Sequence, residues 1–141
     1  MTETFVLRTE LAREMVQHCE EGRPQEACGL LAAQDGEIVR VLKMTNASAS
    51  PVRYSLDPQE QFKAYKLMSD LHLDLAGVFH SHTHTEAYPS PTDVRLASED
   101  VPYVIVSLAS KEASIRAFRI IKTSWTDEDG EIREMPVELV G

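Results

Sequence analysis

The sequence is poor in cysteine and has no long apolar run. Only Cys19 and Cys28 occur among the 141 residues, too few for the disulfide framework of a small secreted domain. We expect both to be small buried apolar side chains in a cytoplasmic protein. No apolar stretch approaches the roughly 18 residues of a membrane-spanning helix, and no basic leader precedes an apolar segment. The sequence therefore predicts neither a membrane span nor a signal peptide, and no membrane partner.

Basic residues and glycine clusters are also scarce. The chain has 14 Lys and Arg against 23 Asp and Glu, a formal net charge of −9, and the basic residues are scattered. Because binding of nucleic-acid phosphates depends on clustered Lys and Arg, we expect no nucleic-acid partner. The six glycines stand singly, so no glycine-rich phosphate loop is present. The acidic surface favours solubility through self-repulsion, or complements a basic patch on a protein partner.

The length predicts one domain over residues 1–141, with mixed secondary structure. Asp57 followed by Pro58 predicts a capped helix through Met68, and Thr9 can cap a helix that ends at Gly22 and carries His18 as an exposed polar residue. We expect His72 to be exposed as well. Strands are expected at 28–33, 38–44, 54–56, 75–79, 103–107, 114–121 and 132–140. This order predicts an α+β fold, a mixed central β-sheet flanked by helices in a three-layer α/β/α-like arrangement.

The strongest signal follows the apolar run 75–79. His80 and His82 are two residues apart, so an extended backbone points both imidazoles to one side, and Asp93 comes eleven residues later. Two histidines and one carboxylate, with a fourth position open to water, are typical of a catalytic zinc site. Ser90 and Asp93 have a second interpretation as the cap and third residue of a helix. The two interpretations are compatible, since a capped helix holds Asp93 rigidly.

The combined spacing, His-x-His-x7-Ser-x2-Asp, resembles the motif of the JAMM (MPN+) metalloprotease family. That family has a glutamate upstream, and the segment Pro24-Gln-Glu-Ala-Cys-Gly-Leu-Leu31 supplies Glu26. Segments 83–90 and 50–58 look most like the bacterial Mec type, and the resemblance extends from Leu7 to about Ile121. The chain departs from many relatives in having Thr83 in place of a proline, and in the additional His84, which would compete for metal if the strand continued.

The resemblance implies a curved sheet of cytidine-deaminase-like topology and one Zn²⁺ per chain, held by His80, His82 and Asp93. It also implies that Glu26 is the general base and that Ser90 donates a hydrogen bond to the developing oxyanion. Arg53 and Tyr54 follow a Ser- and Ala-rich loop. They either help to bind an extended substrate tail or have ordinary surface and core roles.

The Mec type acts on sulfur-carrier proteins of ubiquitin-like fold. The resemblance therefore implies hydrolysis of the amide bond at the C-terminal glycine of such a carrier, which ends in Gly-Gly, with release of cysteine for cysteine biosynthesis. One alternative is an isopeptidase that removes a ubiquitin-like protein from lysine side chains, and another is a non-catalytic scaffold of the same fold. A zinc nucleoside deaminase is not favoured, because its Cys-x-x-Cys ligand pair is missing.

Overall fold

The structure is a computed structural model that describes residues 3–141. Its centre is a six-stranded sheet in the order β3-β2-β4-β5-β6-β7. The strands span Cys28–Gln34 (β2), Glu37–Met44 (β3), Asp74–His82 (β4), Tyr103–Ser107 (β5), Ser114–Ile121 (β6) and Glu131–Met135 (β7). Neighbours are antiparallel except β4 and β5, which run parallel. The sheet is mixed, as expected.

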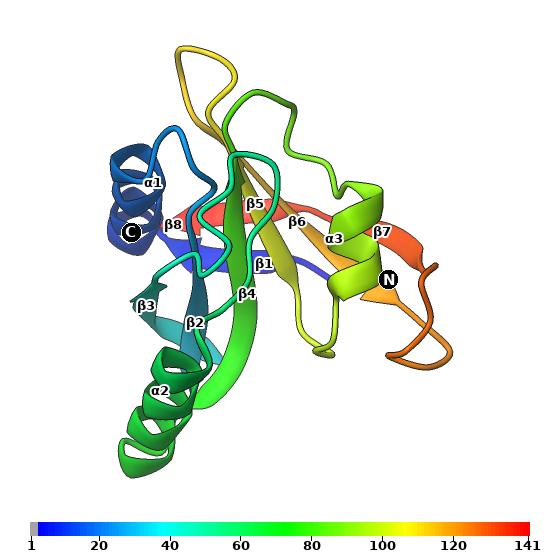
Figure 1. Ribbon diagram of the computed structural model, residues 1–141. Helices are drawn as coiled ribbons and strands as arrows, with labels where there is room; N and C mark the ends of the chain where they lie inside the picture. Colours follow the sequence, from blue (N-terminus) through cyan, green and yellow to red (C-terminus); the bar gives the residue numbers. More distant parts are fainter. Residues whose placement is uncertain (1–2) are drawn as a thin grey trace.

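Helices cover both faces of this sheet (Figure 1). On one face, Leu31 and Ala33 of β2 pack in the core cluster of α1 (Thr9–Glu21). On the other face, Leu30 and Ala32 pack with buried residues of α2 (Pro58–Asp70) and α3 (Pro91–Leu96). Successive residues of a strand point to opposite faces, so β2 is apolar on both sides and has helices on both sides. This arrangement confirms the α+β fold with helices flanking a mixed sheet.

A separate two-stranded parallel sheet joins the ends of the chain. It pairs β1 (Phe5–Arg8) with β8 (Val137–Val140), and its buried Phe5 and Leu7 extend the core beneath α1. The single final strand expected at 132–140 is wrong, because the chain leaves β7 at Pro136. Proline has no N–H for a sheet hydrogen bond, and the carbonyl of Pro136 instead accepts from the Phe5 amide at 2.8 Å.

The helix starts agree with the sequence only in part. The Asp57 carboxylate accepts from the amides of Gln59 and Glu60, as a capping residue should. Thr9 is not a cap, because Arg8 occupies the N-cap position and the Thr9 hydroxyl donates to the carbonyl of Val140. The short strand expected at 54–56 is also absent, since only a single bridge joins Asn46 and Leu56.

The isolated histidines and cysteines have clear environments. His18 was expected to be exposed, and this is wrong: its ring is half-buried, with Nε2 3.0 Å from the carbonyl oxygen of Cys28. His72 is exposed, just beyond α2. Both cysteines are buried and free, as predicted, and burial raises the pKa of each thiol to about 12. No helix within residues 3–141 is long and apolar enough to cross a membrane.

Candidate metal and catalytic site

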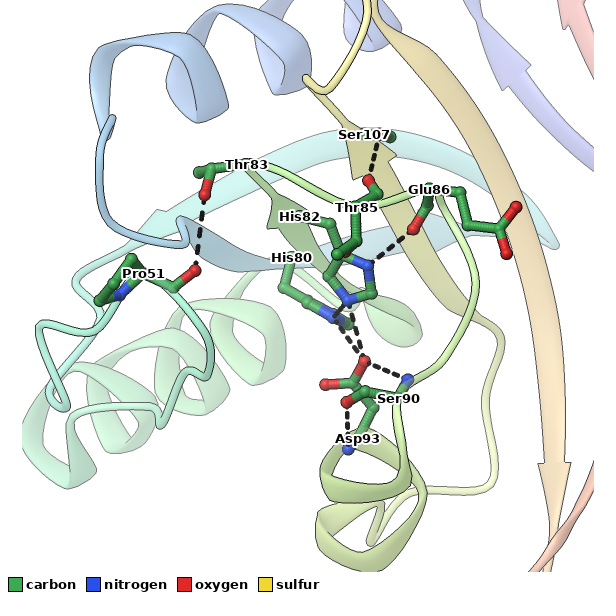
Figure 2. A network of polar contacts seen from close by, with 9 residues as sticks. All are labelled: Pro51, His80, His82, Thr83, Thr85, Glu86, Ser90, Asp93 and Ser107. Atoms are coloured by element: carbon green, nitrogen blue, oxygen red, sulfur yellow. Dashed lines mark hydrogen bonds and ion pairs between the residues drawn. The ribbon is translucent and has the colours of Figure 1, made fainter.

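The candidate site lies where β4 ends. His80 and His82 point to the face that carries α2 and α3, and Asp93 reaches them from the first turn of α3 (Figure 2). The Nε2 atoms of the two histidines are 3.2 Å apart. Asp93 Oδ2 lies 3.2 Å from Nε2 of His80 and 3.0 Å from Nε2 of His82. All three side chains are buried, so the fold brings the predicted ligands to one point inside the protein.

The separations of these atoms fit a metal ion. Bonds of about 2.1 Å in a tetrahedral arrangement place neighbouring ligand atoms about 3.4 Å apart, close to the observed 3.0–3.2 Å. Two imidazole nitrogens and a carboxylate oxygen are a donor set that divalent transition metals bind well. The three residues can therefore hold a metal ion. His84 is exposed, beyond the last residue of β4, and is not part of this group.

The histidine rings are held by groups outside the cluster. Nδ1 of His82 donates to the carbonyl of Glu86 at 2.9 Å, which leaves Nε2 as the atom with a free lone pair (Figure 2). The ring of His80 stacks on Tyr54, with centroids 4.5 Å apart and planes 24° apart. Nδ1 of His80 is buried and has no hydrogen-bond partner in the structure.

Asp93 is held by a helix cap, which confirms the interpretation of Ser90 and Asp93 as the cap and third residue of a helix. The Ser90 amide donates to Asp93 Oδ2 at 2.9 Å, and the Asp93 amide donates to Ser90 Oγ at 3.1 Å. Burial opposes ionisation of Asp93, but hydrogen bonds with His80, His82 and the Ser90 amide hold the pKa of this carboxyl far below its ordinary value. Because Ser90 Oγ acts as an acceptor in the cap, its own hydrogen stays available to a substrate.

Glu26 lies two residues before β2. The antiparallel pairing of Cys28 with His80 brings the segment before β2 alongside the end of β4, with Glu26 opposite His82. The residue is 4% exposed, and its Oε1 has no hydrogen-bond partner in the structure. Burial raises the pKa of Glu26 to about 8, while His82 lowers it and Asp93 raises it. A buried carboxyl beside a metal-binding cluster, with a pKa near neutrality, is suited to proton transfer.

Several contacts of the site could not be read from the sequence. The stacking of Tyr54 on His80 is one, because the two residues belong to separate segments. The hydrogen bond between Ser81 and Ala27 is another. Ser81 lies between the two histidines on β4, so its side chain points to the opposite face, where its Oγ accepts from the Ala27 amide at 2.8 Å. Arg53 is exposed, and its carbonyl accepts from the Asn46 side chain at 2.9 Å.

A first prediction concerns metal content. Purified protein should contain about one metal ion per chain, and His80→Ala or Asp93→Ala should lose it, because each removes one of three ligands. His84→Ala is the matched control and should keep the ion. Elemental analysis of the three variants checks this, and full occupancy in His80→Ala would show that the ligand set is wrong.

A second prediction concerns the pH dependence of stability in metal-free protein. Burial raises the pKa of Glu26 from 4.5 to about 8 in the folded state, whereas the unfolded chain titrates near the ordinary value. The folded state therefore keeps a proton that the unfolded state has lost, and the free energy of unfolding falls as pH rises between these values. Glutamine at position 26 cannot titrate. The free energy of unfolding of Glu26→Gln should therefore exceed that of wild type by an amount that grows from pH 5 to pH 8.

This difference in the free energy of unfolding should increase by on the order of a few kcal/mol across this pH range and level off above pH 8. Thermal unfolding in the presence of a chelator, followed by circular dichroism across this pH range, measures it. Parallel curves for the two proteins would mean that Glu26 titrates normally.

The chain matches a known protein family and several known proteins. Residues 8–121 match the family of prokaryotic homologs of the JAB domain. The chain is 42% identical over 140 residues to the CysO-cysteine peptidase of Mycobacterium tuberculosis, which covers 96% of this chain and 91% of that protein. It is 38% identical over 96 residues to a probable TtuB-protein conjugate cleaving protease of Thermus thermophilus, which covers 67% of this chain and 64% of that protein.

A solved structure agrees with these relatives. The solution structure of a protein from Desulfitobacterium hafniense superposes with a TM-score of 0.84 at 34% identity, covering 97% of this chain and 93% of that one. The family match spans most of the chain and includes Glu26, both histidines, Ser90 and Asp93. The chain therefore belongs to the JAB domain family of JAMM metalloproteases.

Proposed function

We propose that this chain is a zinc-dependent metallopeptidase that hydrolyses the amide bond at the C-terminal glycine of a ubiquitin-like sulfur-carrier protein and releases cysteine. The observation that carries the proposal is the convergence of three buried ligand atoms beside the unpartnered carboxyl of Glu26. The Mycobacterium tuberculosis relative, 42% identical over 140 residues, is named CysO-cysteine peptidase. The two buried free cysteines support a cytoplasmic setting, where thiols stay reduced.

Zinc is the metal that we propose for this site. Three protein ligands of the His, His, Asp type, with room for a fourth ligand, are the usual composition of a catalytic zinc centre. Bound by His80, His82 and Asp93, Zn²⁺ would polarise the substrate carbonyl and lower the pKa of a water molecule to about 7. The hydrogen bond from His82 Nδ1 to the Glu86 carbonyl makes Nε2 a better donor to the ion.

Glu26 is the proposed general base. Its carboxyl takes a proton from the attacking water and then gives it to the leaving amine, which must be protonated to depart. Because burial brings the pKa of this carboxyl to about 8, both the acceptance and the return of the proton are feasible near neutral pH. The positive charge of a bound ion would lower this pKa and favour the form that accepts a proton.

Ser90 is the proposed oxyanion donor. Its Oγ is fixed by the Asp93 amide at 3.1 Å, and its hydrogen can be directed at the substrate oxygen as negative charge develops. Since Ser90 and Asp93 share one helix cap, this donor and one metal ligand keep a constant relation to each other.

A cleft beside the site suits an extended peptide. It has a volume of about 260 Å³, and its lining includes Tyr54, Leu56, Leu96 and Glu99. Tyr54 lines this cleft and also stacks on His80, so the cleft adjoins the cluster. A tail that ends in Gly-Gly fits such a position, because glycine lets its backbone approach the ion without a side-chain clash.

The proposed roles lead to a third prediction. Glu26→Gln should retain zinc and lose nearly all turnover, because glutamine cannot accept a proton. Ser90→Ala should also retain zinc, with kcat lower by roughly 10²–10³-fold if it acts as an oxyanion donor. Steady-state kinetics and metal analysis on the same preparations test both, and a Glu26→Gln enzyme with near wild-type rate would exclude the base role.

The proposed substrate leads to a fourth prediction. A carrier protein with cysteine joined to its C-terminal glycine should be hydrolysed with a higher kcat/KM than the same carrier linked to a lysine side chain. Mass spectrometry of matched reactions distinguishes the products. The Thermus thermophilus relative is named for cleavage of protein conjugates. A clear preference for the lysine-linked carrier would therefore favour the isopeptidase alternative, and failure on both would favour a non-catalytic scaffold.

A further inference from the structure

The backbone of Glu26 is not held by the central sheet. Glu26 precedes β2, and both of its backbone groups bind the loop between β3 and α2, residues 45–57. Its amide donates to the carbonyl of Ser50 at 2.9 Å, and its carbonyl accepts from Asn46 Nδ2 at 2.9 Å. The proposed base is therefore attached to this loop, which we call the β3–α2 loop.

Asn46 organises that loop from within. It is 8% exposed, and its amide group uses its full capacity of two donated and two accepted hydrogen bonds. Nδ2 donates to the carbonyls of Glu26 and Arg53, both at 2.9 Å, and makes a longer contact of 3.4 Å with the carbonyl of Ser50. Oδ1 accepts from the amides of Ser48 at 3.0 Å and Ser55 at 3.1 Å. Aspartate has the same size but cannot replace asparagine here, because its ionised carboxylate accepts hydrogen bonds and cannot donate them.

The residue after Glu26 is held from the opposite side. The Ala27 amide donates to Ser81 Oγ at 2.8 Å, and the Ala27 carbonyl accepts from the Ser81 amide at 3.0 Å. Ser81 lies between the two histidine ligands on β4. Residues 26 and 27 thus form a bridge, with one end on the β3–α2 loop and the other on the strand that carries the metal ligands.

The β3–α2 loop also borders the cluster directly. Tyr54 stacks on His80 and lines the cleft described above. The carbonyl of Pro51 accepts a long hydrogen bond, 3.4 Å, from the hydroxyl of Thr83, one residue beyond the second histidine ligand (Figure 2). The hydrogen bonds of Asn46 and Ser50 join this same loop to the backbone of Glu26.

We propose that Asn46 is a positioning residue for the reaction: it fixes the β3–α2 loop and the backbone of Glu26 as one unit, and so sets the direction of the Glu26 carboxyl. This inference rests on the proposed function for the role of Glu26, but the hydrogen-bond unit itself does not. A buried side chain with four satisfied polar interactions has a defined geometry, and its loss leaves two carbonyls and two amides without partners.

The test compares Asn46→Asp, which keeps the acceptor oxygen Oδ1 and loses the donors on Nδ2, with Asn46→Ala, which loses the whole amide group. Ser48→Ala is the control, since it removes only a half-buried hydroxyl that contacts Ser55 Oγ. In both Asn46 variants kcat should fall between about 10-fold and about 100-fold at unchanged zinc content, and Ser48→Ala should match wild type. In a Glu26→Gln background the same substitutions should lower kcat by less than about threefold, because Asn46 acts through Glu26.

Amide hydrogen exchange, measured by NMR, gives a result that does not depend on turnover. The Glu26 amide should exchange faster in both Asn46 variants, whereas the Ala27 amide, held by Ser81, should keep its protection. In Asn46→Asp the Ser48 and Ser55 amides should stay protected, since Oδ1 is retained. If Asn46→Asp proves too unstable to study, Asn46→Ala supplies the same comparison.

Three outcomes would overturn the proposal: equal losses of kcat with and without Glu26, unchanged protection of the Glu26 amide, or faster exchange with unchanged kcat. If wild type hydrolyses no carrier conjugate, the proposed function fails. The exchange of the Glu26 and Ala27 amides then still decides whether Asn46 holds this unit.

Discussion

The structure around the site depends on one electrostatic interaction, the contact of the Asp93 carboxylate with both Nε2 atoms at the end of β4. A buried carboxylate is costly unless hydrogen bonds or opposite charge compensate it, and here the Ser90 amide contributes as well. Two other polar atoms of the site, Glu26 Oε1 and His80 Nδ1, are buried without hydrogen-bond partners. A second carboxyl with a raised pKa stands beside the first. A divalent cation at this point would stabilise both carboxylates by its positive charge.

The connection between β4 and β5 explains why the ligands meet. These strands form the one parallel pair of the six-stranded sheet, so the chain must cross over a face of the sheet to return. α3 lies on that crossover, and its N-terminal end carries Ser90 and Asp93 to the end of β4. The antiparallel β2 then delivers Glu26 to the same end from the other direction. Groups from three segments, the residues before β2, the end of β4 and the start of α3, therefore meet at one end of these strands.

Sequence reasoning predicted the parts of the site that are local. The alternation of β4 gives the common direction of His80 and His82, and the cap at Ser90 gives the rigid position of Asp93, because each depends on a few neighbouring residues. Predicting that Glu26 belongs to the site required the family resemblance, because only the register of β2 against β4 brings it near the histidines. The stacking of Tyr54 depends on tertiary packing of an irregular loop, for which no periodic signal exists.

The same division holds for the fold. Strands with long apolar or alternating runs, such as 103–107 and 114–121, have the predicted bounds. The four-residue β1 has too few residues for a period, and its pairing with β8 joins the two ends of the chain. Pro136 could have indicated the break between β7 and β8, because a proline inside an expected strand argues against a continuous ladder.

The proposed chemistry also limits where selectivity can arise. Glu26, Ser90 and a metal ion act on the scissile amide and its carbonyl, which are the same whether the leaving amine belongs to cysteine or to a lysine side chain. Discrimination between these amines must therefore come from groups around the cluster that contact what lies beyond the amide. The β3–α2 loop is in a position to do so, since Tyr54 borders both the cleft and His80, and Asn46 joins the loop to Glu26. Substrate recognition and the placement of the base are then properties of one hydrogen-bonded unit, so a substrate that distorts the loop would also misplace the carboxyl that must accept the proton.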